Sequence, residues 1–90
     1  MPQTRRVEIC NQKGLHARAS AAFARMSNDF DSRITVSHEG ESADGGSIMD
    51  LLFLAASKGC EIEIVADGPD ENEAITALAG LVENRFGEDV

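Results

Sequence analysis

The stretch "KGLHARAS", residues 13 to 20, places a histidine where a helix is about to begin. A helix that starts near residue 17 puts His16 at the N-cap position, with the backbone N–H groups of Ala17 and Arg18 pointing towards its ring. Such a helix start has unpaired donors and partial positive charge, which together form an anion site. The same charge disfavours the imidazolium form, and a neutral imidazole is what a nucleophile requires. These residues indicate a nucleophile that binds phosphate; a histidine that only caps the helix or is solvated is the alternative.

The neighbours of His16 fit the same chemistry. Arg18 has a planar guanidinium that can bind phosphoryl oxygens in pairs. Gly14 removes side-chain bulk ahead of the ring and would let another protein approach, while Lys13 and Arg25 would help to receive an acidic partner. A phosphorylated imidazole nitrogen is a good leaving group, so a phosphoryl group on His16 would stay transferable. We expect a site for phosphoryl storage and transfer.

No other pattern in the chain predicts an active site. The sequence has no P-loop, no paired-carboxylate pattern with an evident cleft and no quartet of metal ligands, so we expect neither a metal nor a cofactor. Cys10 and Cys60 lie fifty residues apart without metal-ligand spacing, and we interpret them as reduced thiols. His38 lies in a predicted strand end or turn, where a solvated surface role is expected. The acidic end "GEDV" is interpreted as a solubilising tail.

Alternation of apolar and polar residues predicts four strands, at 6–10, 33–37, 41–43 and 61–65. Helical spacing predicts three helices between them. The first carries a stripe from Leu15 to Phe30, the second begins at Ser47 and is closed by Gly59 at a left-handed cap, and the third runs to Gly87. Asp70 and Glu73 have the spacing of a capping box at the start of the third helix, although Pro69 could instead mark its first turn. The buried stripe of this helix comprises Ile75, Leu78, Val82 and Phe86.

The elements are expected in the order βαββαβα. One-sided strands and amphipathic helices favour an α+β fold, an open-faced two-layer sandwich in which three helices cover one face of a four-stranded antiparallel sheet. Ninety residues fit a single domain, 1–90. The net charge of −8 and the scattered basic residues argue against nucleic acid and anionic membranes as partners. The longest apolar run, Leu51 to Ala56, is too short to span a bilayer, so we expect a cytoplasmic protein.

Two motifs carry a family resemblance. "GLHARAS" resembles the phosphorylation motif of the HPr-like histidine phosphocarriers of the phosphoenolpyruvate-dependent phosphotransferase system, and "SIMDLLFLAASKG" is similar to their regulatory-serine helix. The resemblance runs from about Val7 to Phe86, nearly the whole chain. It implies a stoichiometric carrier, not an enzyme, with the same order of helices and strands.

The resemblance also implies roles for residues. His16 would accept phosphate from phosphorylated enzyme I through Nδ1 and pass it to an enzyme IIA domain, while Arg18 would steady the phosphoryl oxygens. Ser47 would be a regulatory site for an HPr kinase/phosphorylase. The implied carrier is a monomer without cofactor. Its docking residues would be Lys13, Ala19, Ile48, Met49, Leu52 and Phe53. For Ile48 and Leu52 core packing is the alternative, whereas Met49 and Phe53 are expected to be exposed.

Two departures from the family pattern stand out. Ala19 occupies the position where the family commonly has proline, which leaves the helix start less rigidly preset. Asp44 and Asp50 flank Ser47 and make the docking side more acidic than in sugar-transport members, so partners would need more basic surfaces. This acidity and the "LLFLAASKG" stretch favour the nitrogen-related, regulatory branch of the system, although Ser47 in this setting also fits members controlled by the kinase.

Two other functions would fit the same residues. A regulatory adaptor could bind partners according to Ser47 phosphorylation, with His16 taking no part, although the pairing of His16 with Arg18 argues against this. A small hydrolase could use His16 as a general base, but the motif contains no second catalytic group. The phosphocarrier is therefore the leading hypothesis.

Overall fold

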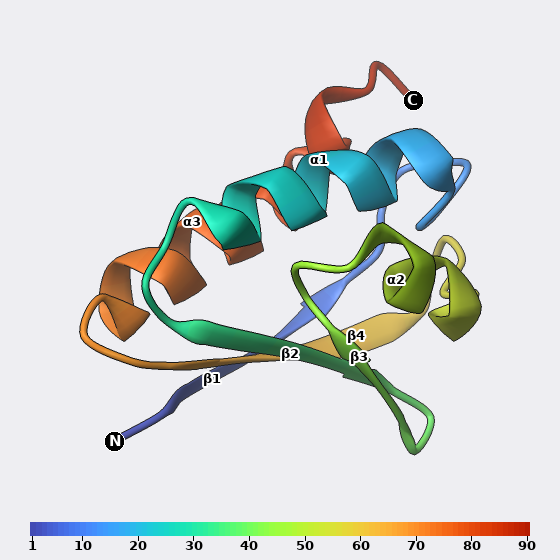
Figure 1. Cartoon of the computed structure of the whole chain (residues 1–90). Helices are drawn as coiled ribbons and strands as arrows, with labels where there is room; N and C mark the ends of the chain where they lie inside the picture. The colour runs from blue at the N-terminus through green and yellow to red at the C-terminus, as the bar shows by residue number, and fades with distance from the viewer.

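The computed structural model describes all 90 residues and confirms the predicted fold class. Three α-helices cover one face of a four-stranded sheet, and the other face is open (Figure 1). A short 3-10 turn, η1, follows the last helix. The elements in chain order are β1 (Gln3–Glu8), α1 (Ala17–Asn28), β2 (Arg33–His38), β3 (Glu41–Asp44), α2 (Ile48–Leu54), β4 (Glu61–Asp67), α3 (Glu71–Glu83) and η1 (Arg85–Gly87).

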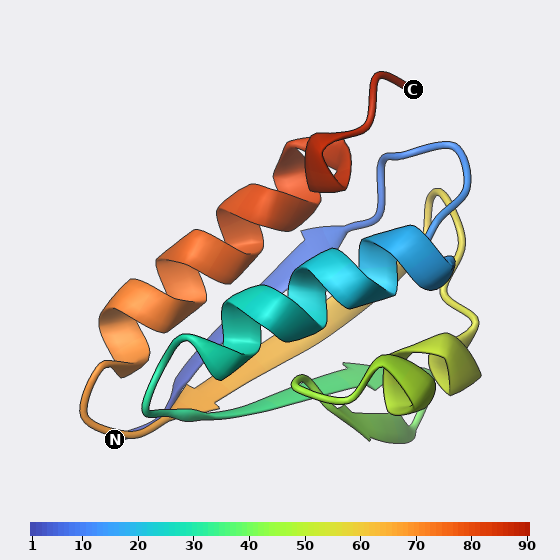
Figure 2. The same cartoon turned by 45° about the horizontal axis from the view of Figure 1, so that its top comes forward.

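The strand order in the sheet is β1-β4-β2-β3, and every neighbouring pair is antiparallel. The last strand of the chain is therefore inserted between the first two. Gln3 of β1 faces Ala66 of β4, and Val36 of β2 faces Ile64 on the other side of β4. α1 and α3 run side by side across this sheet, and α2 lies at the end of the sheet where α1 begins (Figure 2).

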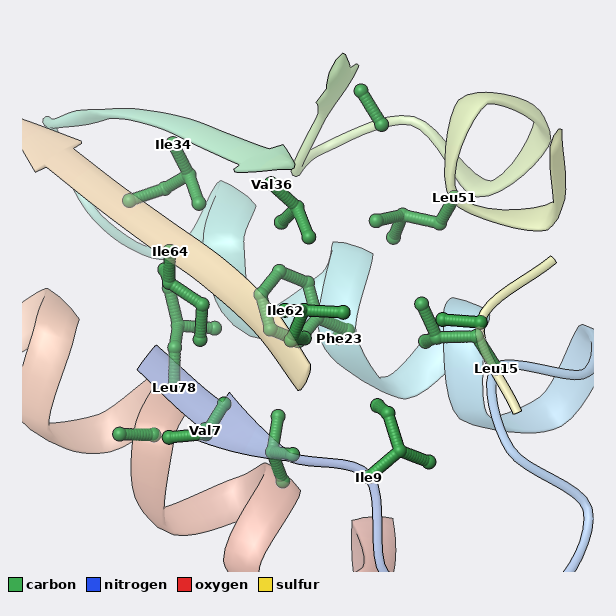
Figure 3. Close-up of a cluster of buried hydrophobic side chains, with 14 of the residues drawn as sticks. Val7, Ile9, Leu15, Phe23, Ile34, Val36, Leu51, Ile62, Ile64 and Leu78 are labelled. Atoms are coloured by element: carbon green, nitrogen blue, oxygen red, sulfur yellow. The ribbon is translucent and has the colours of Figure 1, made fainter. Parts of the chain in front are cut away.

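The core fills the layer between the helices and the sheet (Figure 3). Alternate strand residues point into it, as the sequence predicts: Ile62 and Ile64 of β4 are at most 1% exposed, while Val65 between Ile64 and Ala66 lies half-buried on the open face. Phe23 of α1 has no exposed surface. Burying a side chain of this size contributes roughly 1.5–3 kcal/mol relative to leaving it exposed. The large side chains below 2% exposure include Phe23, Ile9, Leu51, Ile62, Ile64, Leu78, Val36 and Val82.

One predicted helix boundary is confirmed and another is wrong in detail. α1 begins at Ala17, as predicted, and Leu15 lies in the loop before it with its side chain buried in the core. α2 ends at Leu54 and is closed by Ala55, which adopts a left-handed φ of 53°. Gly59, predicted as this cap, has a φ of 91° in the turn that enters β4. Ala55 has the helical spacing of the apolar residues of α2, so the sequence did not show that the helix ends before it.

α3 ends at Glu83, earlier than the sequence predicts. The chain then turns through η1, where Phe86 adopts a φ of 54° and keeps its side chain only 7% exposed. The predicted burial of Phe86 is therefore correct, but its helical position is not. Gly87, with a φ of 82°, ends this turn. The turn directs the last residues back towards the start of α1.

The predicted capping box at the start of α3 does not form. Asp70 is the N-cap residue, but its side chain makes no bond to the helix. Its carboxylate instead accepts hydrogen bonds from the Ser32 hydroxyl at 2.5 Å and the Asp31 amide at 2.8 Å. Asp70 therefore ties α3 to the loop between α1 and β2.

Candidate functional site

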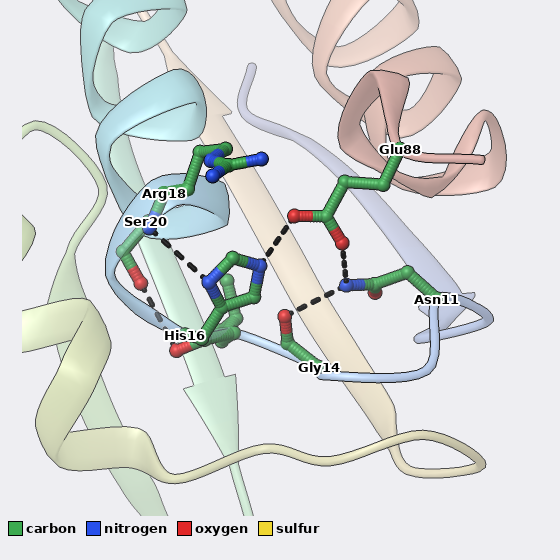
Figure 4. A network of polar contacts seen from close by, with 7 residues as sticks. Asn11, Gly14, His16, Arg18, Ser20 and Glu88 are labelled. Carbon is green, nitrogen blue, oxygen red and sulfur yellow. Dashed lines mark hydrogen bonds and ion pairs between the residues drawn. The ribbon is translucent and has the colours of Figure 1, made fainter. Parts of the chain in front are cut away.

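His16 is the N-cap residue of α1, as predicted (Figure 4). Its backbone is extended, with φ −76° and ψ −177°, and its carbonyl accepts the Ser20 amide at 2.8 Å, the first bond of the helix. Nδ1 of its ring accepts a hydrogen bond from the Arg18 amide at 3.3 Å. The Ala17 amide makes no such bond. One of the free amides of the helix start therefore faces Nδ1, and its hydrogen bond is long enough to be exchanged easily for another acceptor.

The other ring nitrogen of His16 contacts a residue that the sequence did not indicate. Nε2 forms a hydrogen bond with the Glu88 carboxylate, and the side chain of Glu88 is only 13% exposed. The interpretation of "GEDV" as a solubilising tail is therefore wrong for Glu88. The buried Phe86, two residues before Glu88, was the available signal, because an apolar anchor there keeps the following residues against the protein surface.

Asn11 holds Glu88 in place. Its Nδ2 donates to Oε1 of Glu88 and to the carbonyl of Gly14, both at 2.9 Å, and the residue has no exposed surface. The pKa of Glu88 lies below its ordinary value, chiefly because Asn11 donates to the carboxylate; burial opposes this shift, and the bond and charge of His16 support it. Asn11, Glu88 and His16 thus form one hydrogen-bonded chain (Figure 4).

Gly14 has a different role from the one predicted. With a φ of 65°, it lies so close to the chain at 56–57 that a Cβ would stand 2.6 Å from the Ala56 carbonyl oxygen and 2.8 Å from the Cα of Ser57. The amide of Leu15 donates to that same carbonyl at 2.9 Å. The absence of a side chain therefore serves packing within the chain, and it fixes the loop that carries His16.

The basic residues of the motif are exposed beside the ring. The Arg18 guanidinium makes no hydrogen bond or salt bridge within the chain, so its donors are free for a ligand. Lys13 and Arg18 line a pocket of about 310 Å³ together with residues 86–90. The free guanidinium of Arg18 and the helix start can therefore contact an anion bound at Nδ1 of His16.

Ser47 caps α2 with its hydroxyl, which accepts the Asp50 amide at 3.2 Å. The two predicted acidic neighbours also lie there, since Oδ2 of Asp50 accepts the Asp44 amide at 3.3 Å. Ser47 is half-buried. A phosphate on Ser47 would therefore meet two carboxylates at the start of α2.

The predicted docking residues separate into exposed and buried groups. Met49 and Phe53 are 59% and 75% exposed, as expected, and Ile48 is also exposed, at 43%. These three residues are called the α2 patch below. Leu52 is half-buried. Ala19 is only 1% exposed and packs in the core, so its prediction as a docking residue is wrong: the third position of α1 faces the sheet.

The remaining candidates take no part in this site. His38 is less solvated than predicted, since its side chain is 11% exposed and Nδ1 lies 3.2 Å from the carbonyl of Glu61. Cys10 and Cys60 are free thiols. No group of three or more histidine, cysteine or acidic side chains could hold a metal ion. None of the helices has the length and apolar character required to span a bilayer.

Known proteins are similar to this chain over most of its length. The family model described as the PTS HPr component phosphorylation site matches residues 3–84. Phosphocarrier protein HPr of Cupriavidus necator is 46% identical over 80 residues, which cover 89% of this chain and 90% of that protein. Phosphocarrier protein NPr of Proteus mirabilis is 42% identical over 90 residues, which cover 99% of this chain and 100% of that protein.

Solved structures show the same fold. The crystal structure of HPr-C-His from Thermoanaerobacter tengcongensis superimposes with a TM-score of 0.93 at 39% identity and covers 98% of this chain and 99% of that one. The catabolite repression protein Crh of Bacillus subtilis, whose crystal structure is a swapped dimer, has a TM-score of 0.75 at 38% identity, covering 87% of this chain and 90% of that one.

Proposed function

This chain belongs to the HPr family of phosphocarrier proteins of the phosphotransferase system, and from that premise we propose that His16 is its phosphoryl acceptor. In this proposal His16 takes the group from phosphorylated enzyme I and passes it to an enzyme IIA domain. The protein is then a stoichiometric carrier with a covalent phosphohistidine and without a cofactor, acting as a monomer in the cytoplasm.

The observation that carries the proposal is the position of Nδ1 of His16 at the start of α1. The only contact of Nδ1 is the 3.3 Å bond from the Arg18 amide. When Nδ1 bonds to phosphorus, that amide becomes free to donate to a phosphoryl oxygen instead. The free guanidinium of Arg18 adds further donors on the exposed side. The site thus has a nucleophilic nitrogen and an amide that can bind a phosphoryl oxygen 3.3 Å apart.

Transfer would occur only within complexes with partner proteins. In-line displacement requires the donor nitrogen opposite Nδ1, with water excluded between them. The helix α2 lies at the end of the molecule where α1 begins (Figures 1 and 2). A partner that covers the exposed α2 patch can therefore also reach His16. Lys13 and Arg18 would meet acidic groups of that partner.

We further propose that Ser47 is a regulatory site for an HPr kinase/phosphorylase. A phosphoserine carries a charge of roughly −1.5 to −2 at pH 7. At position 47 this charge would lie beside Asp44 and Asp50 and directly next to the α2 patch. A partner that covers the apolar α2 patch would have to desolvate this charge, which weakens docking. The kinase with ATP should modify wild-type protein and leave Ser47→Ala unmodified.

The acidity around Ser47 also supports a place in the nitrogen-related branch. Enzyme I proteins of the two branches can be compared as donors at equal concentration. Faster labelling of His16 by the nitrogen-related enzyme I is the expected result, and equal or slower labelling would contradict it.

The central experiment is incubation with phosphoenolpyruvate and a cognate enzyme I. Intact mass and phosphorus NMR should show one acid-labile phosphoramidate on the wild type and none on His16→Ala. Label that comes only from ATP, resists acid and disappears in Ser47→Ala would favour the regulatory adaptor instead. Turnover of a free phosphoryl or acyl substrate would favour a hydrolase.

A further inference from the structure

The two nitrogens of the His16 ring have different partners, and this difference locates the ring proton. A carboxylate can only accept hydrogen bonds, so the Nε2 that contacts Glu88 must carry a hydrogen. Nδ1 accepts from the Arg18 amide, so it must hold a lone pair. The structure therefore holds the Nε2–H tautomer, with Nδ1 as the nucleophilic atom.

We propose that Glu88 is a positioning residue that keeps the Nε2 proton on His16 throughout the transfer, and that Asn11 holds its carboxylate in place. This role rests on the proposed function of His16 and specifies how its ring is prepared. Glu88 does not touch the phosphoryl group. It acts through the ring, as a carboxylate that accepts the N–H of a metal-bound histidine orients that histidine in other proteins.

The transfer balances without any movement of that proton. The Nδ1 lone pair forms the bond to phosphorus while the bond from phosphorus to the donor nitrogen breaks, and its electron pair returns to the donor. The phosphorylated ring of His16 then carries Nε2–H and a formal positive charge, which lies against the negative charge of Glu88. On discharge the Nδ1–phosphorus bond breaks towards Nδ1 and leaves a neutral imidazole. Without the Nε2 proton the leaving group would be an imidazolate, which is far poorer.

The placement of Glu88 shows that its contact with His16 is built into the fold. Asn11 uses both donors of its buried amide, one on Gly14 of the His16 loop and one on Glu88, so the two segments have a fixed separation. The end of the chain is fastened on both sides. The Gln12 amide donates to the Val90 carbonyl at 3.1 Å, and the Arg85 guanidinium donates to the Asp89 carbonyl at 3.3 Å.

The charges around the site support an ionised Glu88. Lys13 and Arg18 line the adjoining pocket, and Asp89 is the other acidic residue there. The bonds from Asn11 and His16 keep the pKa of Glu88 below its ordinary value. The carboxylate is therefore charged wherever the carrier would operate near neutral pH.

Glu88→Gln tests this role, with Asp89→Asn as the matched control. Both substitutions remove one negative charge from the same segment, but Asp89 is exposed and its side chain makes no hydrogen bond or ion pair with the ring. Nitrogen NMR of the unphosphorylated proteins reports the tautomer of His16. Wild type and Asp89→Asn should show Nε2–H, whereas Glu88→Gln should show a mixture. A wild-type tautomer in Glu88→Gln would overturn the proposal.

Chemical phosphorylation adds a second readout that needs no enzyme I. Phosphoramidate transfers its phosphoryl group to histidine as its own phosphorus–nitrogen bond breaks and ammonia leaves. Wild type and Asp89→Asn should be labelled at Nδ1, and Glu88→Gln at both nitrogens. Loss of a hydrogen bond to a charged group should lower the fraction of phosphorylated rings that keep the Nε2 proton by a factor of about ten or more at mildly alkaline pH. The Nδ1-phosphorylated Glu88→Gln should therefore hydrolyse roughly tenfold more slowly there. Glu88→Asp should restore part of the wild-type rate.

These outcomes separate the two proposals. Equal hydrolysis in wild type and Glu88→Gln, with equal labelling at Nδ1, would overturn the role of Glu88 even if enzyme I phosphorylates the protein. An unlabelled wild type in the enzyme I assay would instead contradict the proposed function, whatever the tautomer. Circular dichroism of each variant shows whether it is folded, and Glu88→Asp provides the carboxylate if Glu88→Gln is not.

Discussion

The amide of Asn11 donates to the carboxylate of Glu88 at 2.9 Å, joining residues 77 positions apart in the chain. This bond is the main reason why the pKa of Glu88 lies below its ordinary value. Replacement of Asn11 by alanine should therefore raise the pKa of Glu88 towards its ordinary value. Carbon NMR of the side-chain carboxyl during a pH titration measures this shift. An unchanged pKa of Glu88 in Asn11→Ala would show that the bond from Asn11 is not its main cause.

The same shift predicts the sign of a pH effect on stability. A carboxyl whose pKa is lower in the folded state than in the unfolded chain stabilises the fold above the unfolded pKa, and this contribution disappears as pH falls through the folded value. The free energy of unfolding of wild type, measured with urea, should thus decrease towards acid pH as Glu88 becomes protonated. Asn11→Ala should lose less between neutral and acid pH, although it starts from a lower stability because the Gly14 carbonyl loses its donor.

Asp70 and Glu73 offer a direct test of the missing capping box. The hydrogen bond from the Ser32 hydroxyl is the main cause that lowers the pKa of Asp70, and the bond from the Asp31 amide is the second. Glu73, in contrast, is exposed and makes no bond to the helix start. Asp70→Ala should therefore lower the urea midpoint clearly and Glu73→Ala hardly at all. Ser32→Ala should raise the pKa of Asp70 towards its ordinary value. Equal effects of Asp70→Ala and Glu73→Ala would instead indicate a capping box in solution.

Gly14→Ala should cost much more stability than Gly40→Ala. Both glycines have a positive φ, 65° and 83°, so both substitutions incur the backbone penalty of roughly 1 kcal/mol. Only at Gly14 would the new Cβ meet backbone atoms, and forcing such a contact adds about 1–3 kcal/mol. Chemical denaturation of the two variants measures the difference. Similar losses would show that the loop at 56–57 yields readily.

Phe53→Ala should weaken partner binding without destabilising the fold. Phe53 is 75% exposed, so its replacement should change the free energy of unfolding by about 0.5 kcal/mol or less. If enzyme I covers the α2 patch, the loss of a central aromatic side chain should cost roughly 1–2 kcal/mol of binding free energy, measured by calorimetry. Val65→Ala on the open face of the sheet is the control and should bind like wild type. Equal affinities for Phe53→Ala and wild type would exclude the patch from this interface.

Short-range patterns of the sequence account for what could be predicted. The alternation around Ile62 and Ile64 and the helical stripe through Phe23 follow from one-sided burial, so the fold class is confirmed. His16 as an N-cap depends on neighbouring residues alone, and it is confirmed as well. The helical spacing placed Ala19 on the apolar face of the first helix, and its burial confirms this; the docking role that the family resemblance implied for it is wrong.

The sequence could not reveal the second half of the site. Glu88 and His16 are 72 positions apart, and no local pattern connects them. Their contact depends on the turn at Phe86, a residue with a left-handed φ that aromatic side chains seldom adopt. Asp70 shows the same limit, since the capping-box spacing was present but a loop 38 positions earlier offered better donors.

The strand order has a consequence for how the chain folds. The only partner of β1 is β4, so Gln3 cannot pair before Ala66 has been synthesised. On a ribosome that adds roughly 5–20 residues per second, β1 waits for seconds with both edges open. The loop after β1 carries His16, and the residue that orients its ring comes later still. Nascent fragments would therefore contain the phosphorylation motif in full and still be unable to act as carriers.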